Sequence, residues 1–306
     1  MSKTPVFVGS CTALITPFTS DFIDFGKLYE LIDEQIEAGT NALVICGTTG
    51  EASTQSIPEH LACVERAVVH AAGRVPIIAG TGSNDTAHAL MMSQNAEKSG
   101  ADALLMVTPY YNKCSQTGLV RHFNYVADRV RIPIILYNVP SRTGMSFTAD
   151  TYAELAKHPN INGVKEASGK LDLAREARAR VGDELYLWSG NDDEILDFLA
   201  LGGKGVISVA SNVVPREISR ICRLYLEGKI NESRELFDKY LPLMKTLFID
   251  VNPIPVKTAM NILGKAVGEL RMPLCETSGE NVAIIKRELA NLGLLTANFP
   301  HEFAPR

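Results

Sequence analysis

Short apolar runs rich in valine, isoleucine and leucine recur along the chain, and segments with a helical pattern separate them. The runs are apolar on both faces, which is typical of strands in a parallel sheet that helices cover on either side. We predict eight strands, at residues 8–16, 41–46, 75–80, 101–108, 132–138, 161–165, 184–190 and 205–209. The clearest amphipathic helical segments between them are residues 25–39, 56–73, 85–100 and 117–130.

Eight strand–helix units within residues 6–227 favour a (β/α)8 TIM barrel, a fold of the α/β class. An open doubly wound sheet would have fewer strands and a glycine-rich dinucleotide turn, and no G-x-G-x-x-G follows the first run. Several helical segments end in a glycine that suits a left-handed cap just before the next strand. These glycines are Gly39, Gly73, Gly100 and Gly202.

The strand pattern stops after about residue 228. Three helical segments follow, at residues 231–249, 255–267 and 279–293. We therefore expect a catalytic barrel over residues 1–227 and a C-terminal helical extension over residues 228–306. No low-complexity linker separates the two parts, so the extension should pack on the barrel.

Composition and charge exclude several classes of protein. Of the 306 residues 46% are apolar and 21% charged, a balance typical of globular proteins. The net charge of −5 does not give the positive field that nucleic-acid binding requires. The chain has neither a signal-peptide pattern at its start nor an apolar stretch long enough to span a membrane. We expect a cytoplasmic protein that binds neither nucleic acid nor membrane.

The cysteines and histidines give no metal-binding pattern. The six cysteines are widely spaced, with no C-x-x-C pair, and the six histidines include no H-E-x-x-H. We expect reduced thiols and no metal ion.

Residues at the carboxyl ends of the strands are the candidates for chemistry, because the active face of a parallel barrel lies there. Lys165 ends the sixth predicted strand, in the stretch "NGVKEASG". Two interpretations remain open at this point. Its ammonium could extend from the strand end to water. Alternatively, desolvation lowers the pKa of an amine, and a neutral amine attacks a carbonyl to form a Schiff base. Glu166 should point away from Lys165, since side chains alternate along a strand.

Other residues at strand ends are also candidates for chemistry, although each could instead have a purely structural role. Tyr137 ends the fifth strand and is either a packed aromatic residue or a proton donor and acceptor. Thr48 and Thr49 lie between two glycines, in a turn that suits a carboxylate or a phosphate but also an ordinary strand–helix connection. After the seventh strand, Asn191 or Asp192 is interpreted as a helix N-cap.

With these residues, the chain resembles the pyruvate-dependent class I aldolase superfamily, which includes N-acetylneuraminate lyase and dihydrodipicolinate synthase. The resemblance extends over essentially the whole length. Five stretches in combination are similar to the dihydrodipicolinate synthases (4-hydroxy-tetrahydrodipicolinate synthases). They are "GTTGE" at 47–51, "YYN" at 110–112, "YNVPSRTG" at 137–144, "GVKEASG" at 163–169 and "NPIPVK" at 252–257.

The resemblance implies a lyase of the lysine and diaminopimelate pathway that condenses pyruvate with L-aspartate 4-semialdehyde. It assigns the Schiff base to Lys165 and proton transfer to Tyr137, which Thr48 links to Tyr111. It assigns the pyruvate carboxylate to Thr49 and the semialdehyde carboxylate to Arg142, with Gly190 and Ile207 in the substrate pocket. The covalent imine with Lys165 takes the place of a cofactor.

The resemblance also implies an assembly, because in this family the tyrosine at the position of Tyr111 enters the site of the neighbouring subunit. We expect a homotetramer built as a dimer of dimers. The family's lysine-feedback site matches in part. Asn84, Tyr110 and His60 match, whereas Ile57 replaces a second histidine. His88 stands where inhibitor-sensitive bacterial enzymes have glutamate, so weak or absent inhibition by lysine is expected.

Two alternatives stay open at the level of sequence. The first is another pyruvate-dependent aldolase, such as a lyase of N-acetylneuraminate or of 2-keto-3-deoxy sugar acids. The second is a catalytically silent relative that serves as a binding protein. The complete set of lysine, tyrosines, threonines and arginine argues against the second alternative.

Overall fold

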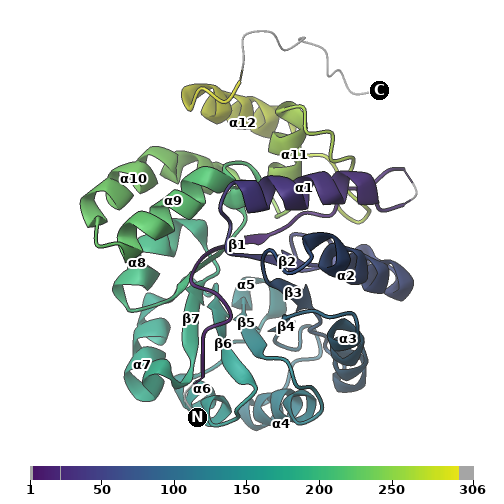
Figure 1. Cartoon of the computed structure of the whole chain (residues 1–306), viewed down its shortest axis with the longest axis vertical. Coiled ribbons are helices and arrows are strands. Elements are labelled where there is room, and N and C mark those ends of the chain that lie inside the picture. Colours follow the sequence, from purple (N-terminus) through teal and green to yellow (C-terminus); the bar gives the residue numbers. More distant parts are fainter. Residues whose placement is uncertain (1–2, 21, 296–306) are drawn as a thin grey trace.

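The eight predicted strands form one closed parallel barrel (Figure 1). The computed structural model describes residues 3–20 and 22–295, and β8 pairs back onto β1 to close the sheet. The strands are β1 (Gly9–Ala13), β2 (Ala42–Ile45), β3 (Ile77–Gly80), β4 (Ala103–Val107), β5 (Ile134–Asn138), β6 (Ile161–Glu166), β7 (Tyr186–Ser189) and β8 (Gly205–Ser208). The predicted (β/α)8 TIM barrel is confirmed.

Helices cover the outside of the barrel (Figure 1). Polar residues that precede the apolar helical patterns start several of them by accepting hydrogen bonds from free backbone N–H groups. At the start of α2, Ser56 and Glu59 cap each other's backbone N–H in a capping box. The helices of this region are α1 (Phe25–Glu37), α2 (Ile57–Ala71), α3 (Thr86–Lys98), α4 (Gln116–Ala127), α5 (Pro140–Thr143), α6 (Ala149–Ala156), α7 (Leu171–Val181), α8 (Ile195–Ala200) and α9 (Pro215–Leu226). Short 3-10 turns lie at Ala52–Thr54, Gly182–Glu184, Asp192–Glu194 and Ala210–Asn212.

The four predicted cap glycines all adopt left-handed backbone conformations. Their φ angles are 86° at Gly39, 72° at Gly73, 88° at Gly100 and 79° at Gly202. These values confirm the predicted helix ends, because residues with a Cβ atom rarely adopt such angles.

The predicted N-cap is confirmed in position but not in its hydrogen bond. Asn191 is the N-cap residue of the 3-10 turn that follows β7, but its side chain makes no capping hydrogen bond. Instead, the buried carboxylate of Asp192 accepts hydrogen bonds from the backbone N–H groups of Val209 and Ala210, at 3.0 and 2.9 Å. Asp192 therefore joins the ends of β7 and β8, a long-range contact that the local sequence pattern does not reveal.

The C-terminal extension contains α10 (Ile230–Thr246), α11 (Ile254–Ile262) and α12 (Gly279–Asn291). The middle helix ends five residues before the predicted boundary at residue 267. Gly264 takes a φ of 78°. The backbone N–H groups of Lys265 and Gly264 turn back to the carbonyls of Met260 and Asn261, both at 3.0 Å. This Schellman arrangement terminates α11, although the apolar pattern continues beyond it.

Three ion pairs among the described residues join the extension to the barrel. Lys265 pairs with Glu34 of α1, Lys257 with Glu51 in the loop after β2, and Arg271 with Glu59 of α2. In Figure 1, α10 lies beside α9, and α12 packs against α10 and α11. Within the described residues, no helix has the length and apolar character that crossing a membrane requires.

The strand register fixes which side chains point into the barrel. Tyr137 of β5 is level with Lys165 of β6, which is level with Trp188 of β7. Tyr137, Trp188 and Ile207 belong to one buried apolar cluster, whereas Leu136 and Val164 belong to the larger cluster beneath the helices. This alternation directs Lys165 to the interior at the carboxyl ends of the strands.

Candidate active site

Lys165 is buried in the upper interior of the barrel. Its residue is only 5% exposed, and its Nζ atom lies 4.5 Å from the centroid of the Tyr137 ring. Among the residues that the structure describes, no acceptor or acid forms a hydrogen bond or an ion pair with this ammonium. A lysine held in this way is a suitable nucleophile for a carbonyl, since no hydrogen bond has to be broken before it reacts.

Gly190 lies close to Lys165, and Ile207 faces the same barrel interior. A Cβ atom added to Gly190 would meet Lys165 Cε at 3.1 Å and Ala167 Cβ at 2.5 Å, so the backbone after β7 approaches the lysine closely. Ile207 on β8 is fully buried in the same apolar cluster as Tyr137. The structure therefore brings Gly190 to the lysine, while the role of both residues in a substrate pocket stays a prediction.

Glu166 points away from Lys165, as strand alternation predicts. Its carboxylate accepts hydrogen bonds from Asn138 Nδ2 at 3.0 Å and from the Tyr152 hydroxyl at 2.7 Å. Burial, together with the Glu166 carboxylate, raises the pKa of Tyr152 well above its usual value. These bonds join the ends of β5 and β6 behind the site, so Glu166 is occupied on the opposite face of the strand.

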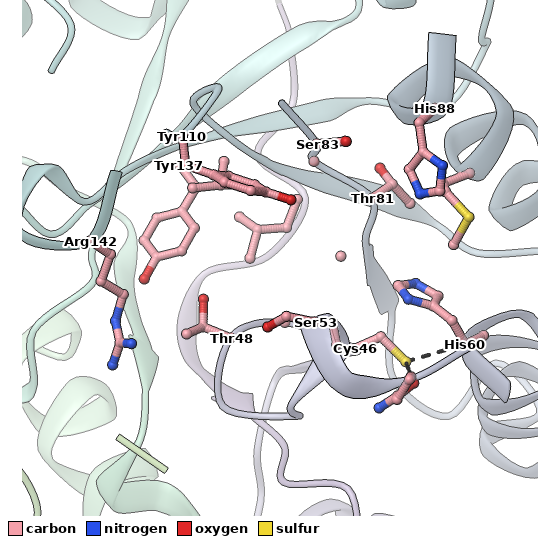
Figure 2. A pocket seen from close by; sticks show the side chains of 18 of the residues that line it. Cys46, Thr48, Ser53, His60, Thr81, Ser83, His88, Tyr110, Tyr137 and Arg142 are labelled. Carbon is pink, nitrogen blue, oxygen red and sulfur yellow. Dashed lines mark hydrogen bonds between the residues drawn. The ribbon is translucent and has the colours of Figure 1, made fainter. Parts of the chain in front are cut away.

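A pocket of about 470 Å³ opens beside this interior. Thr48, Tyr137 and Arg142 lie at one end of it, and His60 and His88 lie at the other (Figure 2). Tyr137 connects the pocket to the lysine, since its side chain lines the pocket and its ring contacts Lys165.

The turn after β2 presents two threonines in different surroundings. Thr48 lines the pocket, whereas Thr49 is buried and accepts a hydrogen bond from Asn252 Nδ2 at 3.0 Å. Glu51 closes the turn with a left-handed φ of 55°. Its carboxylate binds Lys257 Nζ at 2.9 Å and the backbone N–H of Arg271 at 3.0 Å. The extension therefore holds this turn in place.

Arg142 lies in the short helix α5, which follows β5 directly. Its Nη2 atom donates to the backbone carbonyl of Asn252 at 2.9 Å. The guanidinium has further N–H groups to bind a carboxylate. Asn252 is a site residue to which the sequence analysis assigns no role. It belongs to the motif at 252–257, which could have indicated it.

Tyr111 lies apart from Thr48 and Tyr137 within a single chain. It is 89% exposed, adopts a left-handed φ of 66° and does not line the pocket. Within the described residues of a single chain, its hydroxyl makes no hydrogen bond with Thr48 or Tyr137.

The pocket as a whole includes most of the predicted lysine-feedback residues. Ile57, His60, His88 and Tyr110 line it, whereas Asn84 is not among its lining residues. His60 and His88 lie at the far end, and Tyr110 lies beside Tyr137 (Figure 2). Burial lowers the pKa of His60 to about 4, and the nearby His88 adds to this effect. His60 Nε2 has no hydrogen-bond partner among the described residues. This end of the pocket thus offers imidazole and hydroxyl groups.

The part of the chain that the structure describes contains no candidate metal site. No three His, Cys, Asp or Glu side chains gather there in a way that could hold a metal ion. All six cysteines are free, and four of them are buried.

Comparison with known proteins identifies the family. The model of the dihydrodipicolinate synthetase family matches residues 6–292. The 4-hydroxy-tetrahydrodipicolinate synthase of Thermoanaerobacter sp. (strain X514) is 51% identical over 292 residues, which cover 95% of this chain and 98% of the relative. The structure of dihydrodipicolinate synthase from Aquifex aeolicus matches with a TM-score of 0.93 at 45% identity, covering 95% of this chain and 100% of that one.

A third relative is a monomeric dihydrodipicolinate synthase variant, whose structure matches with a TM-score of 0.93 at 40% identity. The match covers 95% of this chain and 98% of that chain. Sequence and fold agree over nearly the entire chain, and the chain belongs to the dihydrodipicolinate synthetase family.

Proposed function

We propose that this chain is a 4-hydroxy-tetrahydrodipicolinate synthase, a lyase that condenses pyruvate with L-aspartate 4-semialdehyde through an imine on Lys165. The observation that carries the proposal is the placement of Lys165. Its side chain is buried at the carboxyl ends of the strands, and its ammonium lies against the Tyr137 ring and has no hydrogen-bond partner among the described residues. The family and the activity named for the relative from Thermoanaerobacter support the same conclusion.

The reaction starts when Lys165 Nζ attacks C2 of pyruvate. The carbonyl oxygen takes one proton from the amine and one from a proton donor, and it leaves as water to give a protonated imine. The protonated imine accepts electron density from C3, so that C3 can lose a proton and become an enamine carbon. This carbon attacks the aldehyde of the semialdehyde and forms a carbon–carbon bond. The amine of the second substrate then adds to C2 and displaces Lys165, which closes the ring and releases (4S)-4-hydroxy-2,3,4,5-tetrahydrodipicolinate. The imine provides the electron sink, so the scheme uses no cofactor.

The neighbouring residues have distinct proposed roles. Tyr137 transfers protons at the reacting atoms, since its side chain lies between Lys165 and the pocket. Thr49 binds the carboxylate of pyruvate. Arg142, at the same end of the pocket as Tyr137, binds the carboxylate of the semialdehyde. Gly190 leaves room for Lys165 and its imine, and Ile207 forms the apolar wall.

We propose that two chains complete each site. Tyr111 is 89% exposed beside the pocket residue Tyr110, a position from which it can enter a neighbouring subunit. There it would join Thr48 and Tyr137 in a chain of hydroxyl groups. A homotetramer, as a dimer of dimers, is the proposed assembly. Analytical ultracentrifugation tests this point, and its result matters because one relative in this family is a monomeric variant.

We also propose that residues 1–227 form the catalytic unit and residues 228–306 an extension, of which the described part, residues 228–295, stabilises it; residues 1–2, 21 and 296–306 lie outside the described residues. The support is the pair of contacts from Lys257 and Asn252 to the turn at 47–51. A cytoplasmic location stays a prediction from the sequence.

Borohydride trapping tests the central proposal. The protein is incubated with pyruvate and sodium borohydride, digested and analysed by mass spectrometry. We expect the mass of a reduced pyruvate adduct on the peptide that contains Lys165, and none in Lys165→Ala. A coupled assay should then show turnover of aspartate semialdehyde and no cleavage of N-acetylneuraminate. An unmodified Lys165 peptide would refute the proposal.

A further inference from the structure

Asn252 of the C-terminal extension contacts both predicted carboxylate-binding residues at once. Its side-chain Nδ2 donates to Thr49 Oγ1 at 3.0 Å, and its backbone oxygen accepts from Arg142 Nη2 at 2.9 Å. Asn252 is buried, and its two partners come from the turn after β2 and from the short helix α5 after β5. One residue therefore determines the relative position of two groups that belong to different strand ends.

The bond to Thr49 determines where the hydrogen of its hydroxyl can point. A threonine hydroxyl has one hydrogen to donate and two lone pairs that accept. Because the amide N–H of Asn252 occupies a lone pair, the hydrogen is free to donate elsewhere. Thr49 Oγ1 makes no other hydrogen bond within residues 3–20 and 22–295. The hydroxyl is thus prepared to donate to a carboxylate oxygen.

The unused end of the Asn252 amide argues against a purely structural role. Its Oδ1 atom is buried and has no hydrogen-bond partner among the described residues, which costs free energy. Asn261 in the same extension shows the contrasting case. Its Nδ2 donates to the Gly268 carbonyl at 2.9 Å, and its Oδ1 accepts from the Val267 N–H at 2.8 Å. Asn261 uses both ends of its amide to fold the chain, whereas Asn252 uses one end to hold Thr49.

We propose that Asn252 is a positioning residue for both substrates. Its side chain orients the Thr49 hydroxyl as a donor to the carboxylate of pyruvate, and its backbone carbonyl orients Arg142 for the carboxylate of the semialdehyde. This inference rests on the proposed roles of Thr49 and Arg142. Since the two contacts use different parts of Asn252, a side-chain substitution separates them.

Steady-state kinetics of three variants test the inference. Asn252→Ala should raise the KM for pyruvate by about five- to tenfold, the equivalent of one neutral hydrogen bond. It should leave the KM for the semialdehyde within about twofold, because the backbone carbonyl remains. Asn252→Asp should raise the KM for pyruvate further, since a carboxylate can only accept and would take the Thr49 hydrogen. Asn261→Ala, the matched control, should lower the melting temperature and leave both KM values unchanged.

A double-mutant cycle with Thr49→Val separates this inference from the proposed role of Thr49. If Asn252 acts through Thr49, adding Asn252→Ala to Thr49→Val should change the KM for pyruvate by less than twofold. A raised KM in Thr49→Val with a normal KM in Asn252→Ala would overturn the inference alone. A normal KM in Thr49→Val would overturn the role of Thr49 itself. The pyruvate concentration that half-saturates borohydride trapping provides the same comparison if a variant folds but turns over too slowly.

Discussion

Lys257 of α11 and Glu51 of the turn after β2 form an ion pair at 2.9 Å, and the two side chains are 1% and 0% exposed. Lys257 also donates to the backbone carbonyls of Thr16 and Glu269. Burial lowers the pKa of Lys257, and the Glu51 carboxylate opposes this effect. The pair lies two residues from Thr49, so the extension and the catalytic turn are joined by a charge contact that excludes water.

Loss of this pair should destabilise the protein strongly. Lys257→Ala leaves the Glu51 carboxylate buried without its cation, which typically costs about 3–5 kcal/mol. Lys265→Ala is a matched control, because Lys265 also pairs with a barrel glutamate but its side chain and that of Glu34 are 19% and 43% exposed. The control should cost less than about 1 kcal/mol. Urea unfolding at fixed protein concentration measures the unfolding free energy of both variants. Equal losses of unfolding free energy in the two variants would contradict the expectation.

The sequence predicts the barrel well because its strands are local features. Apolar runs, helical periodicity and cap glycines such as Gly39 and Gly202 depend on residues near one another in the chain. The apolar pattern also placed Lys165 at a strand end and therefore on the active face. The end of α11 was missed because Gly264 stops the helix inside a pattern that continues.

Contacts between distant segments could not be predicted from the pattern. The bond between Asn252 and Thr49 joins residues 203 positions apart, and the bonds from Asp192 to Val209 and Ala210 cross from β7 to β8. Nothing in the local composition of either segment specifies such a partner. The position of Tyr111 in a completed site stays a prediction, since one chain does not bring it to the pocket.

Removal of the guanidinium of Arg142 should affect the second substrate selectively. Arg142→Ala is expected to raise the KM for aspartate semialdehyde at least about tenfold, since a charge-assisted hydrogen bond contributes about 1.5–3 kcal/mol. Pyruvate should still form the borohydride-trapped adduct on Lys165. Arg175→Ala is the control, because Arg175 is 57% exposed on α7 and pairs only with Asp172 among the described residues. If only the KM for pyruvate rose, Arg142 would bind pyruvate and not the semialdehyde.

Enlargement of Gly190 should displace the reactive lysine. The added Cβ of Gly190→Ala would lie 3.1 Å from Lys165 Cε and 2.5 Å from Ala167 Cβ, so a neighbouring group has to move. We expect kcat to fall about tenfold or more, as small displacements of a catalytic group commonly do. Gly279→Ala is the control, since nothing lies within 4 Å of its added Cβ. The idea fails if both variants retain full kcat.

Feedback inhibition by lysine should be weak. The far end of the pocket presents His60 and His88, and the described residues that line the pocket include no carboxylate to meet an ammonium group. His88→Glu introduces such a carboxylate and should lower the lysine concentration for half-maximal inhibition. Ser83→Ala, which removes only a hydroxyl from the same pocket, is the control. Half-maximal inhibition of the unmodified protein at submillimolar lysine would contradict this prediction.

Protonation of His60 should contribute to acid destabilisation. Burial lowers its pKa in the folded protein to about 4, whereas an unfolded histidine has a pKa of about 6.5. Because the folded value is the lower one, the unfolded state binds the proton more tightly. Stability is therefore fully present above about pH 6.5 and is lost as the pH falls toward about 4.

Urea unfolding of the wild type and of His60→Gln between pH 4 and 7 measures this contribution. The unfolding free energy of the variant should depend less steeply on pH. The difference in slope should correspond to at most one fewer proton taken up per chain on unfolding. Some dependence should remain, because burial also lowers the pKa of His122 to about 4. His122→Gln should produce a similar reduction, and the double variant should combine the two. Identical slopes for wild type and His60→Gln would show that His60 does not stay neutral in the folded protein over this range.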